Sequence, residues 1–297
     1  MPKPRIPILV AAVAAVLAAA GCLVGCAQPD PTCTPKPSAS VMAAPTEAAS
    51  TAPPVPALTR SEIAALPAAV YDAVVPGLLP APAGKLTAPT AHRVMFDVPL
   101  FGADRATPVA RIPATDFRGQ RTVVVPIQLD GPWALVLTPA RQVLPSEVAA
   151  GEPAALAQTA AWMPAASLAG TTTLAKSVRI SVAEQSLSIL DAAGTVTASW
   201  KVGVGTDETP TPTGVTGYLQ ARYTDPDQGQ SVHPIQLTSL HATAADEPFG
   251  GSDGGLIGIH YFEQSSGAVS HGCVRLPADA LTAVNALPLG TLVVIEG

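Results

Sequence analysis

The stretch that decides the fold of this chain is Ser270-His271-Gly272-Cys273-Val274-Arg275-Leu276, with Ile257-Gly258-Ile259-His260 just upstream. A cysteine follows a glycine at the end of a short polar run, and a histidine ends an apolar, strand-like run. A free thiol with its usual pKa of about 8.5 is mostly protonated at neutral pH, so a nucleophilic cysteine needs a base or a positive neighbour. We therefore predict that Cys273 is a nucleophile and that His260 is its general base.

The residues around the thiol have chemistry that fits this interpretation. His271 is only two residues from Cys273, so we assign it to the pocket as a secondary residue. Gly272 lets the backbone approach a substrate carbonyl, and the N–H groups of Gly272 and Cys273 are predicted to bind an oxyanion. Ser270 is predicted to fix the turn by a hydrogen bond. Arg275 suits either a substrate carboxylate or a surface salt bridge, and both remain open.

The composition favours short strands joined by turns. Hydrophobic residues make up 48% of the chain, but aromatic residues only 4%, and 32 Pro and 24 Gly exclude a predominance of long helices. We therefore predict a mainly β fold. The net charge is −6 and no cluster of Lys or Arg occurs after the first five residues, which excludes nucleic-acid binding as a function class.

The N-terminus predicts export. Residues 1–25 have a short positive region, an apolar stretch and a small-residue end, which are the parts of a secretory signal. Leu23-Val24-Gly25-Cys26 resembles a bacterial lipobox, so Cys26 is the predicted lipidation site and Cys22 the second candidate. An uncleaved signal anchor is the alternative. We expect the protein to be held by lipid at the outer face of the cytoplasmic membrane.

Three further segments precede the catalytic region. Residues 26–58 are rich in Pro, Ala, Ser and Thr, and are predicted to be a disordered tether. Residues 59–90 begin with the capping box Thr59-Arg60-Ser61-Glu62 and are predicted to be a short helical linker, with the helix broken at Pro67. Residues 91–170, in which Trp162-Met163-Pro164 precedes the last strand, resemble a bacterial SH3-like β-barrel and are predicted to be a spacer or wall-binding module.

The C-terminal block, residues 174–297, holds the chemistry. Alternating apolar residues predict strands at 178–182, 186–190 and 195–204, and a final strand at 290–295. Pro277 suits the first position of a short helix that runs to about Leu287. The body of the protein has one cysteine, Cys273, so no disulfide can form within it.

The motifs of this block resemble the active-site signature of the L,D-transpeptidase catalytic domain family, over roughly Leu174 to Gly297. The segments 211–214 and 290–295 resemble that family as well. The resemblance implies a β-rich domain in which Cys273 is the nucleophile and His260 the base. His271, Ser270 and Gly272 would match the second motif histidine, the motif Ser/Thr and the oxyanion glycine.

The resemblance also implies a reaction. The thiolate would attack the third residue of a peptidoglycan tetrapeptide stem, release the terminal D-alanine and pass the acyl group to an amine of a neighbouring stem, which gives a 3→3 cross-link. Carbapenem-type inhibitors would acylate the same thiol, and no cofactor or metal is implied.

This chain departs from the family pattern beside the base. Tyr261-Phe262 follows His260, where the family usually has Gly and a small residue. The backbone carbonyl that orients the base would then come from Tyr261, and the bulky side chains would reshape the pocket. Arg275 stands where one version of the motif has Asn.

Other interpretations remain at this point. The histidines and Cys273 could be metal ligands, but their spacing fits no zinc pattern. A papain-like peptidase has its cysteine before its histidine, which is the reverse of the order here. A non-catalytic wall-binding lipoprotein would not need the thiol. An L,D-carboxypeptidase would use the same residues with water as the acceptor.

Overall fold

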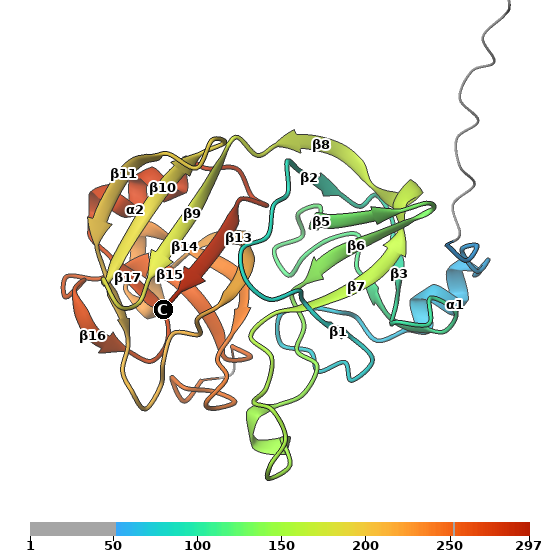
Figure 1. The fold of residues 1–297 in the computed structure, drawn as a ribbon, viewed down its shortest axis with the longest axis horizontal. Coiled ribbons are helices and arrows are strands. Elements are labelled where there is room, and N and C mark those ends of the chain that lie inside the picture. The colour runs from blue at the N-terminus through green and yellow to red at the C-terminus, as the bar shows by residue number, and fades with distance from the viewer. Residues whose placement is uncertain (1–51, 252) are drawn as a thin grey trace, which may run out of the picture. The chain divides into compact units, whose positions relative to one another are not determined.

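The described residues form two β-sheets and only two short α-helices, which confirms the mainly β prediction (Figure 1). The computed structural model describes residues 52–251 and 253–297. The predicted signal peptide, the candidate lipidation sites Cys22 and Cys26, and most of the predicted tether lie outside these residues. Within the described residues, no helix is long and apolar enough to cross a membrane.

The first sheet contains eight strands, in the order β4-β3-β7-β6-β5-β2-β8 with β1 paired to β7. The strands are β1 (Leu79–Pro80), β2 (Thr90–Arg93), β3 (Val98–Phe101), β4 (Pro108–Ile112), β5 (Val123–Asp130), β6 (Trp133–Thr138), β7 (Thr159–Pro164) and β8 (Ala169–Thr173). The short 3-10 helices η1 (Pro145–Glu147) and η2 (Ala165–Ser167) precede β7 and β8. The antiparallel meander β5–β6–β7 forms the centre, and β8 returns to pair with β2. Residues 94–97 form the connection between β2 and β3.

The predicted capping box begins helix α1 (Arg60–Ala65). The Glu62 N–H donates to Thr59 Oγ1 at 3.2 Å, and the Thr59 N–H donates to Glu62 Oε2 at 2.7 Å. The helix ends before Pro67, as predicted.

The predicted linker of residues 59–90 is largely part of the first domain. Ala69, Val75 and Leu78 are buried in the core of the first sheet. Their chain is fixed by backbone hydrogen bonds, including those from the Ala69 N–H to the Arg111 carbonyl and from the Val75 N–H to the Arg141 carbonyl. The predicted tether also ends earlier than residue 58, because its described end packs on the same domain.

The second sheet contains ten strands, in the order β11-β10-β9-β18-β13-β14-β15-β17-β12-β16. Its elements are β9 (Lys176–Ser181), β10 (Ser186–Asp191), β11 (Val196–Lys201), β12 (Gly203–Gly205), β13 (Val215–Asp225), η3 (Pro226–Gln228), β14 (Gln230–His241), β15 (Leu256–Tyr261), β16 (Gly267–Ser270), β17 (Val274–Leu276), α2 (Ala278–Asn285) and β18 (Leu292–Glu296). The strands predicted in this block are present. Pro277 caps α2 instead of occupying its first turn.

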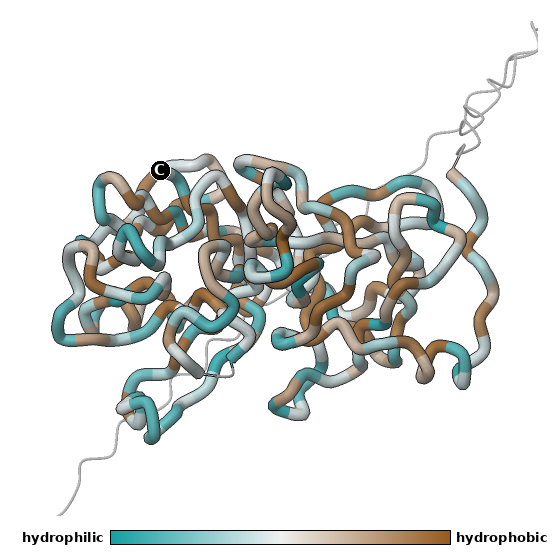
Figure 2. Tube along the Cα trace, turned by 90° about the horizontal axis from the view of Figure 1, so that it is seen from below, coloured by the Kyte–Doolittle hydropathy of each residue, from teal (hydrophilic) through white to brown (hydrophobic). Residues whose placement is uncertain are grey.

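Apolar side chains fill the space behind the second sheet. Ala280, Leu281 and Val284 on one face of α2 join the core formed by β9, β10, β15, β17 and β18. The Trp200 indole N–H donates to Asp279 Oδ2 at 2.8 Å and ties the helix to β11. Apolar segments run through the interior while the outer loops are mostly polar (Figure 2).

The two sheets share an apolar cluster within the compact unit Ala49–Gly297. Ala91 and Val123 of the first sheet pack there with Tyr218 and Leu292 of the second. Gly290 lies at this contact with φ +92°, and a Cβ at this position would clash with the Ala91 side chain and approach Val123 Cγ1 to 3.3 Å. The contact therefore requires glycine.

We predict that Gly290→Ala lowers the free energy of unfolding by about 2–5 kcal/mol, because it combines a left-handed backbone with overpacking. The matched control is Gly214→Ala, where φ is +71° but nothing lies within 4 Å of the added Cβ. Gly214→Ala should lower the free energy of unfolding by only about 1–2 kcal/mol. Urea denaturation measures both values. Equal losses for the two variants would contradict the packing argument.

Candidate active site

The predicted nucleophile and base lie on one face of the second sheet. Strands β15 and β17 pair in parallel, with His260 opposite Arg275. Side chains alternate along strands, so residues two apart share a face. One cavity of about 500 Å³ is accordingly lined by residues of both strands and of the turn before β17, namely Gly258, His260, Cys273 and Arg275. The structure thus brings together residues from both halves of the sequence motif.

The Cys273 thiol is half-buried and free. Its sulfur accepts a hydrogen bond from the Gly258 N–H at 3.3 Å, and its S–H lies 3.7 Å from the Leu256 carbonyl oxygen. Burial raises the pKa of Cys273 to about 11, although the Gly258 N–H acts in the opposite direction. The resting cysteine at neutral pH is therefore a thiol.

The imidazole of His260 is oriented by the next peptide group. Its Nδ1–H donates to the Tyr261 carbonyl at 3.0 Å, which leaves the Nε2 lone pair free to accept a proton. Gln230 Nε2 donates to the same carbonyl at 2.9 Å. Tyr261 thus supplies the orienting carbonyl that the resemblance implied.

The charge state of His260 suits a base. Burial lowers the pKa of His260, with a further decrease from the positive charge of Arg275, and the hydrogen bond to Tyr261 opposes this. The imidazole is therefore neutral at pH 7. In the described part of the chain no hydrogen bond joins His260 to Cys273, so the two form a neutral pair at rest and not an ion pair.

The two bulky residues beside the base have different places. The Tyr261 ring packs on His233, with 4.5 Å between ring centroids, and leaves the cavity clear. Phe262 lines the cavity and is 42% exposed. Its ring centroid lies 6.3 Å from that of His260 and 4.1 Å from the Arg275 guanidinium carbon. Phe262 is thus the side chain that reshapes the pocket.

Arg275 makes no ion pair with any described residue. Its Nε is buried without a hydrogen-bond partner, and its guanidinium stacks on Phe262. The salt-bridge alternative therefore has no partner here, whereas a guanidinium held over an aromatic ring in the cavity can pair with a carboxylate.

The turn before the thiol is closed by Ser270, as predicted. Its hydroxyl donates to the Cys273 carbonyl at 2.5 Å and accepts from the Gly272 N–H at 3.2 Å. Gly272 has φ +113°, a region that L side chains rarely adopt. Because the Gly272 N–H is already bonded, the oxyanion role predicted for it is wrong in this geometry. The Cys273 N–H, for which the described residues offer no acceptor, remains as the donor.

Thr211 is a supporting residue to which sequence reasoning gave no role. Its hydroxyl donates to the Gly272 carbonyl at 2.7 Å and accepts from the Gly205 N–H at 2.9 Å. It therefore links β12 to the turn that carries the thiol. The sequence signal for this role is the segment 211–214, which resembles the family but does not by itself indicate which hydrogen bonds Thr211 makes.

His271 occupies the rim of the cavity, in line with its predicted secondary role. It is exposed, and its ring meets that of Phe249 edge to face with centroids 5.7 Å apart. Among the described residues, no group of three or more His, Cys, Asp or Glu side chains is arranged to hold a metal ion.

Residues 175–295 match the family model YkuD, described as the L,D-transpeptidase catalytic domain. The C-terminal region is therefore similar to that family, and the match covers less than half of the chain. Cys273, His260, Ser270, Gly272 and Arg275 all lie within the matched residues. No curated protein matches the chain.

Several solved structures are similar to this chain at low identity. L,D-transpeptidase 3 from Mycobacterium tuberculosis, in complex with a faropenem-derived adduct, is 14% identical over 75% of this chain and 98% of that one, with a TM-score of 0.34. L,D-transpeptidase 1 from the same organism is 16% identical over 47% and 78%, with a TM-score of 0.31. An L,D-transpeptidase from Stackebrandtia nassauensis is 18% identical over 41% and 56%, with a TM-score of 0.31. The chain spans about half the length of several structures that it matches.

One wall of the cavity comes from residues outside the matched region 175–295. This wall consists of Tyr71 and Phe117, which lie beside Tyr223. The ring centroids of Tyr71 and Phe117 are 4.9 Å apart, and those of Phe117 and Tyr223 are 5.7 Å apart. The Tyr71 carbonyl accepts a hydrogen bond from the buried His241 Nε2–H at 2.9 Å. Burial lowers the pKa of His241 to about 4, so this contact is made by a neutral ring.

The loop between β14 and β15 closes another side of the cavity. The Glu247 carboxylate accepts from the N–H groups of Asp253, Gly254 and Gly255 at 2.9–3.2 Å. The buried Arg141 of the first domain lies against this loop and attracts Glu247. Burial raises the pKa of Asp253, which faces the cavity, to about 6.

We predict that Cys273 is alkylated slowly by iodoacetamide at pH 7, because burial raises its pKa to about 11 from the usual value of about 8.5 and so lowers its thiolate fraction roughly 300-fold. The rate should keep rising up to about pH 11. Mass spectrometry of the Cys273 peptide measures this rate, with glutathione as the reference thiol. A plateau below pH 9 would show that the resting cysteine is already an anion.

Proposed function

We propose that this protein is a peptidoglycan L,D-transpeptidase that forms 3→3 cross-links by cysteine acyl transfer. The observation that carries the proposal is the thiol of Cys273 in the same cavity as His260, whose Nδ1 is held by the Tyr261 carbonyl and whose Nε2 is free. This arrangement supplies a nucleophile and an oriented base on adjacent strands. The match of residues 175–295 to the L,D-transpeptidase catalytic domain supports the same chemistry.

In the first half-reaction the carbonyl carbon of the third stem residue meets the sulfur. The thiol proton passes to His260 Nε2 as the sulfur attacks, and the negative oxygen is stabilised by the Cys273 N–H. Collapse of this intermediate breaks the peptide bond to the terminal D-alanine. The imidazolium returns its proton to the leaving amine, and a thioester to Cys273 remains.

In the second half-reaction an amine of another stem attacks the thioester. His260 takes the proton from that amine, the carbon–sulfur bond breaks, and the proton returns to the sulfur. The product is a new amide, and the thiol is regenerated. Water in place of the amine would give a free carboxylate, which is the carboxypeptidase outcome.

Arg275 is proposed to bind a carboxylate of the donor stem. The guanidinium lies in the cavity, stacked on Phe262, and has no ion-pair partner among the described residues. The terminal D-alanine carries a carboxylate close to the bond that is broken, so this charge would orient the donor stem toward Cys273.

The proposed location is the outer face of the cytoplasmic membrane. The support is the secretory pattern of residues 1–25 and the lipobox that ends at Cys26, both read from the sequence. Stem peptides of peptidoglycan and carbapenem-type β-lactams, which present a reactive carbonyl to the thiol, are the proposed ligands.

Incubation with purified disaccharide-tetrapeptide tests the function. We expect loss of the terminal D-alanine and a dimer in which two third residues are joined, both identified by mass spectrometry. Cys273→Ala is the control and should form no product, because loss of a catalytic nucleophile costs about 10⁶-fold in rate. Release of a tripeptide without any dimer would show carboxypeptidase activity instead of transpeptidase activity. The absence of any product from folded protein would contradict the proposal that the protein is an enzyme.

A further inference from the structure

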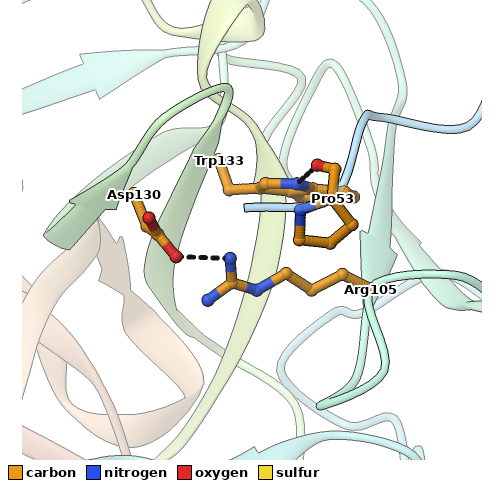
Figure 3. A network of polar contacts seen from close by, with 4 residues as sticks. All are labelled: Pro53, Arg105, Asp130 and Trp133. Atoms are coloured by element: carbon orange, nitrogen blue, oxygen red, sulfur yellow. Dashed lines mark hydrogen bonds and ion pairs between the residues drawn. The ribbon is translucent and has the colours of Figure 1, made fainter. Parts of the chain in front are cut away.

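A short proline-rich segment lies on the face of the first domain away from the catalytic motif. The Trp133 indole N–H donates to the Pro53 carbonyl at 2.6 Å (Figure 3). Trp133 is fully buried although its ring meets this N-terminal segment, 80 positions away in the sequence. The segment thus provides the hydrogen-bond acceptor for the N–H of a buried indole ring.

The segment packs on a cluster of buried aromatic residues, which we call the aromatic groove. Phe101, Trp133 and Trp162 come from β3, β6 and β7 and form one cluster. The Phe101 and Trp133 rings meet edge to face, with centroids 5.0 Å apart and planes at 82°. Ala52, Val55 and Leu58 pack against this cluster, so apolar side chains spaced three residues apart enter the groove.

The segment itself has the chemistry of a polyproline II ligand. Residues 53–58 belong to no helix or strand, and Pro53, Pro54 and Pro56 have no N–H to contribute to one. The backbone is still extended at Thr59, with φ −73° and ψ 159°. A polyproline II segment is already extended before it binds, so it docks in aromatic grooves at a small cost in entropy.

An arginine in a strained conformation closes one side of the groove. Arg105 has φ +52°, which costs an L residue about 1–2 kcal/mol. Its guanidinium carbon lies 3.5 Å from the centre of the Trp162 ring, and its Nη1 pairs with Asp130 at 2.6 Å. Figure 3 shows this pair beside Trp133 and Pro53. The strain holds a cation on the outer face of the groove.

We propose that this aromatic groove is a recognition site for extended, proline-rich polypeptide, and that the chain's own residues 52–58 occupy it in cis. Trp133 recognises a backbone carbonyl, and the cluster takes apolar side chains at every third residue. Docking fixes the point at which the N-terminal segment leaves the domain. It shortens the free spacer by seven residues, or about 20 Å in a polyproline II conformation.

Exchange of the Trp133 indole proton tests the contact directly. The chain has 3 tryptophans, so ¹⁵N–¹H spectra of the exported chain contain few indole signals, and Trp133→Phe assigns the relevant one. We expect slow exchange in the wild type. Val55→Asp, which places a charge in the groove, should speed exchange at least tenfold. Ala57→Asp is the matched control because Ala57 is exposed and lies outside the cluster, and it should change the rate less than twofold.

A second measurement tests recognition as opposed to mere packing. A synthetic peptide of residues 51–58, added to the Val55→Asp chain, should restore slow exchange in a saturable way, and the same peptide carrying Asp for Val should not. Fast exchange in the wild type, equal effects of the two Asp variants, or failure of the peptide to bind would each overturn the proposal. If diluting the protein made exchange of the Trp133 indole proton fast, and sedimentation showed a dimer dissociating over the same concentrations, the segment would be docking on a second chain. That result would contradict docking in cis.

Discussion

The parallel pairing of β15 with β17 is the constraint on which the rest of the site depends. It sets His260 beside Arg275 and brings the Gly258 N–H to the sulfur of Cys273. A shift of one residue in this register would turn the thiol and the imidazole to opposite faces of the sheet. The core beneath α2 and the turn closed by Ser270 both serve to hold this register.

The electrostatics of the site follow from burial more than from charge pairing. Burial raises the pKa of the thiol and lowers that of the imidazole, so both groups are neutral at rest. A neutral pair can exchange a proton when a substrate carbonyl arrives, and it spends little time as a reactive thiolate in its absence. Because the pKa of His260 is lowered, acid should impair this base at a lower pH than it would impair an ordinary histidine.

Short sequence motifs were sufficient to predict those features of the structure that depend on neighbouring residues. The Ser-His-Gly-Cys turn, the strand that ends in His260 and the capping box at Thr59 each depend on residues within a few positions of one another. Contacts across more than 100 positions left no such signal. Tyr71 in the cavity wall comes from the predicted helical linker. Phe117 in the cavity wall and Arg141 against the Glu247 loop come from the region predicted to be a spacer or wall-binding module. The bonded Gly272 N–H depends on where the Ser270 hydroxyl points, which no pattern predicts.

The proposed reaction depends above all on Cys273 as an acyl-accepting nucleophile that His260 activates. Intact-mass measurement after incubation with a carbapenem tests it most directly. We expect one covalent adduct in the wild type, none in Cys273→Ala, and formation slowed about 10²–10⁴-fold in folded His260→Ala. An adduct that persists in Cys273→Ala, or no adduct on folded wild-type protein, would contradict it.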